Sequence, residues 1–185
     1  NEVPFLDRFA AAAAAGFRGV EYLFPYEHTP EVMAATLKSA GVENVLFNMP
    51  AGDWAKGERG IAALPGREEE FRQGVTKALE YARVMGVTRL HAMAGIVPPG
   101  GPDAASCHKT YVANIKYAAT ETAKANIALL IEPINTRDMP GFFLNKQAQA
   151  ADVLAEVDAP NIKMQMDCYH MQIMEGDLAR TIESN

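Results

Sequence analysis

The 185-residue sequence predicts an α/β fold, a (β/α)8 TIM barrel that lacks its first strand and its last strands. Helical and strand-like segments alternate along the chain, which is typical of right-handed βα units in a parallel sheet. Three predicted strands end in a polar side chain, at Asn48, Glu132 and Asp167, and catalytic residues of such barrels lie at these strand ends. Only about five strands can be found against the eight of a complete barrel, so we expect a partial one.

Amphipathic segments predict six helices: one before the first strand, four between successive strands and one at the end of the chain. In the third helix, Phe71 and Val75 begin a stripe with the i, i+3/i+4 spacing of a single buried face. Gly16, Gly41 and Gly86 follow the first three helices, where a left-handed residue commonly ends a helix. The predicted helical ranges are 3–15, 30–40, 67–85, 103–125, 145–157 and 174–185.

Short apolar or β-branched runs predict five strands, at 18–24, 42–48, 88–94, 126–132 and 161–167. Because alternate residues of a strand face the same side, we expect Glu132 and Asp167 to converge on the inner face of the barrel. An open dinucleotide-binding sheet fits less well, because no GxGxxG motif follows the first strand. No linker or shift in composition divides the chain, so residues 1–185 are predicted to form one domain.

The composition excludes several classes of partner. The net charge is −6, the pI is about 5.2, and the Lys and Arg residues are scattered, which disfavours binding to nucleic acid or an anionic membrane surface. No apolar stretch approaches the length of a membrane span or of a signal-peptide core, and a cytoplasmic location is expected. Cys107 and Cys168 are too few for a disulfide framework or a cysteine zinc site.

The segment IEPINTRDMPG places a carboxylate, Glu132, at the end of the apolar run NIALLI. A charge there is costly unless it has a partner, and a second carboxylate at Asp167 would repel it unless a divalent cation lay between them. His170 is expected to reach the same site from the loop after Asp167. The alternatives are a structural ion pair of Glu132 with an arginine, and a His170 that caps a helix start or packs on Tyr169. Oxygen ligands favour Mg²⁺ or Mn²⁺, and an added imidazole would admit Co²⁺ or Zn²⁺.

Three long segments are distinctive: LFNMPAGDWAKGERGIAALPGREEEF, LLIEPINTRDMPGFFL and MQMDCYHMQIMEGDL. They resemble the matching parts of the hydroxypyruvate isomerase family, which belongs to the xylose isomerase-like TIM barrels of the sugar isomerase/epimerase superfamily. The resemblance implies a divalent metal held by Glu132 and Asp167, with two further ligands, one of them a second catalytic glutamate, on strands that would follow this sequence. It also implies proton transfer through an enediolate, with Glu132 as the catalytic base.

The resemblance extends to substrate-binding residues. In the related ketose epimerases, a histidine three residues after the metal-binding Asp and an acidic residue six after the metal-binding Glu contact substrate hydroxyls. His170 and Asp138 match these spacings in this chain. We also expect Asn48, His91 and Trp54 at the substrate site, although a hydrogen-bonded core histidine is an equally good interpretation of His91.

Further expectations concern residues of the predicted loops. Phe142, like Trp54, is expected to wall the active site, because closing loops exclude water from enediolates. The alternative for both is a contact between subunits of an oligomer, which exposed loop aromatics also form. Glu58 and Arg59 are expected to form a salt bridge within their loop.

The first functional hypothesis is a metal-dependent isomerase that interconverts hydroxypyruvate and tartronate semialdehyde. An alternative is an isomerase or epimerase of a longer 2-oxo acid or ketose, such as 2-oxo-tetronate. An alternative of another class is a non-catalytic barrel fragment or binding module. In each enzymatic case the partner is a small hydroxy-oxo acid or sugar, and open sheet edges would favour a homo-oligomer.

Overall fold

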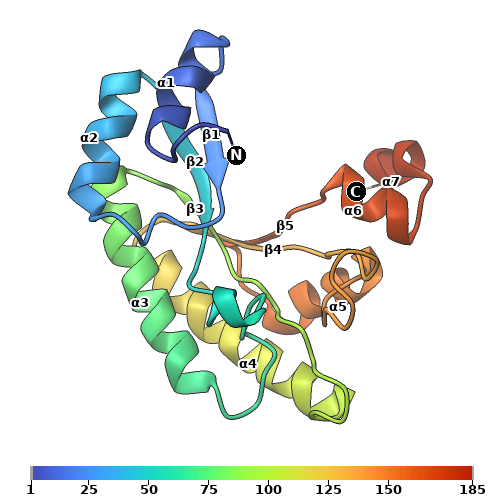
Figure 1. Ribbon diagram of the computed structural model, residues 1–185. Coiled ribbons are helices and arrows are strands. Elements are labelled where there is room, and N and C mark those ends of the chain that lie inside the picture. Colours follow the sequence, from blue (N-terminus) through green and yellow to red (C-terminus); the bar gives the residue numbers. More distant parts are fainter. Residues whose placement is uncertain (1, 185) are drawn as a thin grey trace.

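The computed structural model describes residues 2–184, and its centre is a sheet of five parallel strands (Figure 1). The strands pair in sequential order, so the predicted parallel arrangement is confirmed. Sequential parallel pairing with a helix between successive strands is how the wall of a (β/α) barrel is built, and the sheet is a partial barrel of this kind. The strands are β1 (Gly19–Tyr22), β2 (Glu43–Asn48), β3 (Arg89–His91), β4 (Ala128–Ile131) and β5 (Ile162–Met164).

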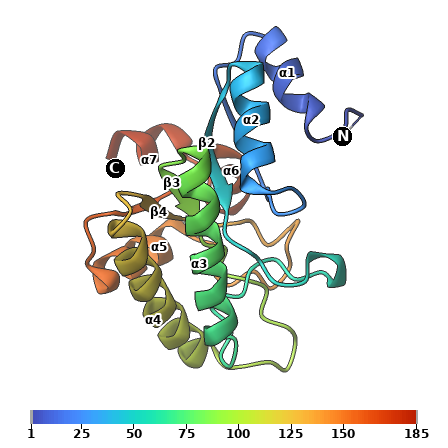
Figure 2. The ribbon, with the colours of Figure 1, turned by 90° about the vertical axis from the view of Figure 1, so that its left-hand side faces the viewer.

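Helices cover one face of this sheet. They are α1 (Asp7–Ala14), α2 (Pro30–Ala40), α3 (Glu68–Met85), α4 (Ala104–Ala123) and α5 (Gln147–Val157). Each of these helices packs against the next one along the chain. Figure 2 looks onto α2, α3 and α4, with the strands behind them. This layer leaves the opposite, inner face of the sheet for polar side chains.

Capping residues explain where the helices start and stop. Thr29 begins α2 by accepting a hydrogen bond from the Val32 amide at 3.4 Å, and Asp103 does the same for α4 from the Ser106 amide at 2.9 Å. Gly41 and Gly86 end α2 and α3 with φ angles of 70° and 71°, in the left-handed region that glycine adopts without a steric penalty. These helix ends agree with the glycine pattern of the sequence.

The core lies between the sheet and its helices. Leu129 and Ile131 of β4 are fully buried on the outer face, where α3 and α4 contribute Val75 and Ile115 to the same cluster. Leu130, between the two β4 residues, is only half-buried and faces the opposite side. The alternation along β4 therefore separates an apolar outer face from the inner face on which the site is built.

The C-terminal part differs from the prediction in where its helices lie. The helix expected over 174–185 is present as α7 (Leu178–Ser184), which begins four residues later, and a separate short helix, α6 (Cys168–Met174), precedes it. Gly176 and Asp177 lie between the two helices with φ angles of 70° and 50°. The end of the predicted range, at residue 185, lies outside the described residues. Within the described residues, no helix is long and apolar enough to cross a membrane.

Candidate active site

A cavity of about 360 Å³ opens at the carboxyl ends of the strands, on the inner face of the sheet. Every strand or the loop directly after it contributes to its lining, as expected for a barrel whose site is built from several strand ends. Two residues predicted at the site, Asp138 and Phe142, do not line it. The predicted residues that do are Asn48, Trp54, His91, Glu132, Asp167 and His170.

Glu132 follows the last residue of β4 directly and is 7% exposed. Burial removes water from its carboxylate, and this raises the pKa of Glu132 to about 8, with further contributions from the negative charges of Asp167 and Glu21. A carboxylate that is buried beside two others is a strong ligand for a cation, because the cation offsets both the desolvation and the repulsion.

Three potential ligand atoms, one each from Glu132, Asp167 and His170, lie within 4.8 Å of one another. Two oxygen ligands that share one cation at about 2.0–2.6 Å from it can be up to about 5 Å apart, so this spacing suits one ion. The predicted convergence of Glu132 and Asp167 is confirmed. The donor set therefore fits the divalent metal implied by the resemblance.

Asp167 also caps the N-terminus of α6. The strand β5 ends at Met164, and Asp167 is the N-cap residue of the helix. Its Oδ1 accepts hydrogen bonds from the backbone amides of Tyr169 at 2.6 Å and His170 at 3.3 Å. Since these bonds use only Oδ1, the other carboxylate oxygen can bind a cation without unwinding the helix.

His170 lies in the first turn of α6, so its predicted place in a loop is wrong. A helix start near His170 was the alternative interpretation of this segment, and the residue that caps the helix is Asp167. A helical first turn fixes the distance between the cap residue and the third residue after it. The side chains of Asp167 and His170 therefore enter the cavity from one rigid element.

His91 and Asn48 are paired neighbours in β3 and β2. His91 Nδ1 lies 3.0 Å from Asn48 Oδ1 and 3.7 Å from Glu132 Oε2. Burial, together with the nearby His170, lowers the pKa of His91 to about 4, so its ring is neutral at pH 7. Its Nε2 is buried without a hydrogen-bond partner among the described residues, unlike a fully satisfied core histidine. The ring is therefore free to bond a substrate oxygen.

Asp138 is exposed and lies in a hydrogen-bond network beside the cavity. Its Oδ2 accepts from the Tyr169 hydroxyl at 2.6 Å and from Asn135 Nδ2 at 3.0 Å. These bonds hold the pKa of Asp138 below its usual value. Its contact with substrate stays a prediction. Asn135 is fully buried, and the sequence analysis missed it because nothing in the pattern IEPINTRD distinguishes it from an ordinary loop asparagine.

Trp54 walls the cavity from the loop between β2 and α3, where it begins the short 3-10 helix Trp54–Lys56. Phe24 packs edge-on against the Trp54 ring at 5.0 Å. On the same ring, the Arg59 guanidinium lies 3.8 Å from the centroid. Phe142 has a different position from the one expected, because it is 1% exposed within the hydrophobic core and is not part of the cavity lining.

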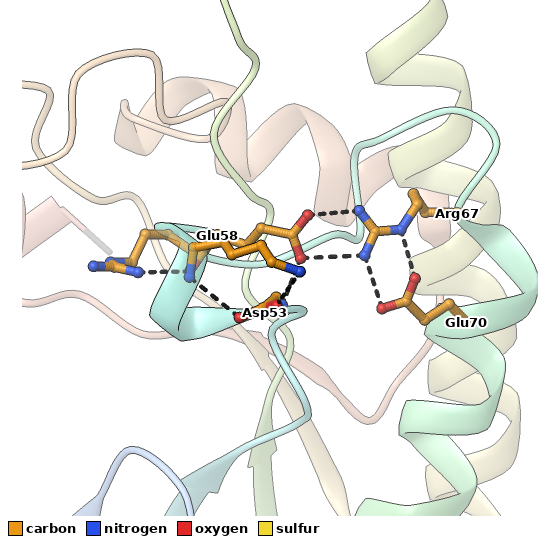
Figure 3. Close-up of polar contacts among 6 residues, drawn as sticks. Asp53, Glu58, Arg67 and Glu70 are labelled. Atoms are coloured by element: carbon orange, nitrogen blue, oxygen red, sulfur yellow. Dashed lines mark hydrogen bonds and ion pairs between the residues drawn. The ribbon is translucent and has the colours of Figure 1, made fainter.

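The expected salt bridge between Glu58 and Arg59 is wrong, because Glu58 pairs with Arg67 at 2.8 Å (Figure 3). The planar guanidinium group of Arg67 donates to the carboxylates of Glu58 and Glu70 at the same time. Arg59, which follows Glu58 directly in the chain, could not bind the two carboxylates with this planar geometry. Glu58 also accepts from the backbone amide of Asp53 at 2.5 Å. Glu58 thus ties the segment just before Trp54 to the start of α3.

We expect Glu58→Ala to loosen this loop with little effect on global stability. The substitution leaves the Asp53 amide and one side of Arg67 unpaired, but ion pairs near the surface contribute only about 0–1 kcal/mol to the free energy of unfolding. Hydrogen exchange of the amides in 51–62 should accelerate. Glu70→Ala is the matched control, since it removes the other partner of Arg67 and keeps the Asp53 contact. Equal exchange in both variants would contradict the role given to Glu58.

The model of the xylose isomerase-like TIM barrel family matches residues 9–184. A 2-oxo-tetronate isomerase of Cupriavidus necator is 55% identical over 183 residues, which cover 99% of this chain and 70% of that protein. The hydroxypyruvate isomerase of Escherichia coli is 49% identical over 182 residues, which cover 98% of this chain and 70% of that protein. The chain thus spans about 70% of the length of either relative.

Solved structures agree with this grouping. A Brucella melitensis protein described as an AP endonuclease of family 2 superimposes with a TM-score of 0.96 at 52% identity, over 100% of this chain and 70% of that one. A D-psicose 3-epimerase of Clostridium cellulolyticum has a TM-score of 0.79 at 16% identity, over 98% of this chain and 64% of that one, and shares the fold. The chain therefore belongs to the xylose isomerase-like TIM barrel family, among relatives 40–55% identical to it that are named as hydroxypyruvate and 2-oxo-tetronate isomerases.

Proposed function

We propose that the protein is a metal-dependent isomerase of short 2-oxo-3-hydroxy acids, with 2-oxo-tetronate as its preferred substrate. The observation that carries the isomerase assignment is the buried Glu132 carboxylate, gathered with Asp167 and His170 at the strand ends. The choice of substrate reverses the order reached from the sequence, which put hydroxypyruvate first. The identity of 55% to a 2-oxo-tetronate isomerase, against 49% to a hydroxypyruvate isomerase, supports the longer acid.

The proposed reaction moves one hydrogen from C3 to C2 of the substrate and the hydroxyl proton from the C3 oxygen to the C2 oxygen, so that the carbonyl group moves from C2 to C3. Glu132 takes the proton from C3 of the substrate, and a proton is returned to C2 of the planar enediolate. Glu132 and Asp167 would hold Mg²⁺ or Mn²⁺, which supplies positive charge where the oxyanion develops. His91 and His170 line the same cavity and are available to hold the two substrate oxygens that exchange roles.

The test compares the two acids directly. Protein supplied with Mg²⁺ is incubated with either substrate in D₂O, and deuterium entering the carbon skeleton is followed by NMR. We expect kcat/KM for 2-oxo-tetronate to exceed that for hydroxypyruvate by at least about 10-fold, since one extra group in a fitted pocket is worth about 10–200-fold. A chelator should abolish exchange, and added Mg²⁺ or Mn²⁺ should restore it.

The other outcomes identify the rival hypotheses. A kcat/KM for hydroxypyruvate that equals or exceeds the value for the longer acid would return hydroxypyruvate to first place. Binding of either acid without any deuterium exchange, whether or not metal is present, would support the non-catalytic binding module.

A further inference from the structure

We propose that Asn135 is a positioning residue that holds His170 as the neutral tautomer with its proton on Nε2. His170 then presents a hydrogen-bond donor to the cavity and is not a third metal ligand. That the Nε2–H of His170 donates to substrate during turnover rests on the proposed function. The tautomer of His170, and the conclusion that His170 does not bind the metal, do not rest on it.

The orientation of the Asn135 amide is fixed by its neighbours. Its Oδ1 lies 2.8 Å from the backbone nitrogen of Asp138, which can only donate. The NH₂ group therefore lies on the other side, where Nδ2 donates to Asp138 Oδ2 at 3.0 Å. The exchange of oxygen and nitrogen would break both bonds at once. Because Asn135 is fully buried, water cannot replace them.

The same NH₂ group faces His170. Asn135 Nδ2 lies 2.7 Å from His170 Nδ1, and the Asn135 backbone nitrogen lies 3.4 Å from the same atom. Both groups are N–H donors, so Nδ1 has to present its lone pair to them. A neutral imidazole carries one N–H, and in His170 the hydrogen must therefore be on Nε2.

This tautomer decides what His170 can do in the site. A histidine binds a metal through a nitrogen lone pair. In His170 the Nδ1 lone pair is engaged by Asn135, and Nε2 carries the hydrogen. Among the described residues of the cluster, metal binding then falls to Glu132 and Asp167. The Nε2–H can instead donate to the substrate oxygen on which negative charge grows in the enediolate.

The direct test is the tautomer of His170, read by long-range ¹H–¹⁵N NMR on histidine-labelled protein. The chain has 4 histidines, and the His170→Gln variant identifies the signals that belong to His170. We expect a protonated Nε2 and an acceptor Nδ1, unchanged when Mg²⁺ is added. A proton on Nδ1, or loss of the Nε2 proton on adding Mg²⁺, would overturn the proposal.

Variants at Asn135 test whether this residue fixes the tautomer of His170. Asn135→Asp replaces the NH₂ donor with an acceptor of the same size, so the His170 hydrogen should move to Nδ1. Asp138→Asn is the matched control: it keeps the Asp138 backbone amide that orients Asn135, and the tautomer should not change. If Asn135→Asp does not fold, Asn135→Ala replaces it, and a mixture of both tautomers is expected. An unchanged His170 spectrum in a folded Asn135 variant would show that another contact fixes the ring.

Kinetics separate positioning from a structural role. In Asn135→Ala we expect KM for the hydroxy-oxo acid to rise by about 10-fold or more, with metal affinity unchanged, because the variant loses a substrate donor and not a ligand. An equal loss of metal affinity would indicate that the site had collapsed and would contradict the positioning role. The NMR result does not depend on turnover, so failure of the proposed function leaves the tautomer test intact.

Discussion

Glu132→Gln should reduce turnover by about 10²–10⁴-fold, the contribution of a general base, while the affinity for Mg²⁺ falls much less. Glutamine keeps the size of the side chain and one oxygen ligand, but it cannot accept and return a proton. Because burial raises the pKa of Glu132 to about 8, the neutral amide relieves the burial of a carboxylate above that pH, and there the metal-free variant should be no less stable than the wild type.

The measurement combines isomerisation kinetics with calorimetry of Mg²⁺ binding and thermal unfolding of the metal-free protein. The matched control is Glu156→Gln, which removes a carboxylate that pairs with His108 at 2.7 Å between α5 and α4, away from the cavity. A kcat near the wild-type value in Glu132→Gln would show that Glu132 is not the catalytic base. Activity that does not change when a chelator is added would show that the reaction does not need a metal ion.

The alternation of helices and strands could be predicted because it depends on local patterns. The buried stripe of α3 and the glycines that end α2 and α3 are properties of a few neighbouring residues. Strand ends were harder to predict. The run 88–94 continues to look like a strand, but β3 ends at His91, and the carbonyls of Met93 and Ala94 accept hydrogen bonds from the backbone amides of Ala62 and Ala63. Hydrophobicity predicts that a residue is buried, but it does not predict which backbone segment pairs with it.

The two carboxylates of the site could be predicted for a geometric reason. The carboxyl ends of parallel strands lie at one end of a barrel, so Glu132 and Asp167 had to approach each other once the fold class was known. Asn135 and Arg67 could not be found in this way. The contact of Asn135 with His170 joins residues 35 positions apart, and the contact of Arg67 with Glu58 depends on how a loop folds back onto α3. Such contacts follow from loop conformations, for which the sequence has no periodic signal.

Asp167→Asn and Asp167→Ala should lose metal affinity together but differ in stability, because Asp167 both caps α6 and belongs to the metal cluster. An asparagine oxygen caps a helix about as well as an aspartate, so Asp167→Asn should change the free energy of unfolding by only a few tenths of a kcal/mol, whereas alanine should cost about 0.5–2 kcal/mol. Either change replaces a charged ligand, so Mg²⁺ affinity should fall by about 10-fold or more.

Asp103 is the matched control for this comparison. It caps α4 in the same way, through the Ser106 amide at 2.9 Å, and it is exposed and outside the metal cluster. Asp103→Asn and Asp103→Ala should therefore reproduce the stability difference while Mg²⁺ affinity stays at the wild-type value. Unfolding is measured with chelator present, so that bound metal does not add to stability, and affinity is measured by calorimetry. Wild-type Mg²⁺ affinity in Asp167→Asn would exclude Asp167 as a ligand, and equal stability of the two Asp167 variants would exclude its role as a cap.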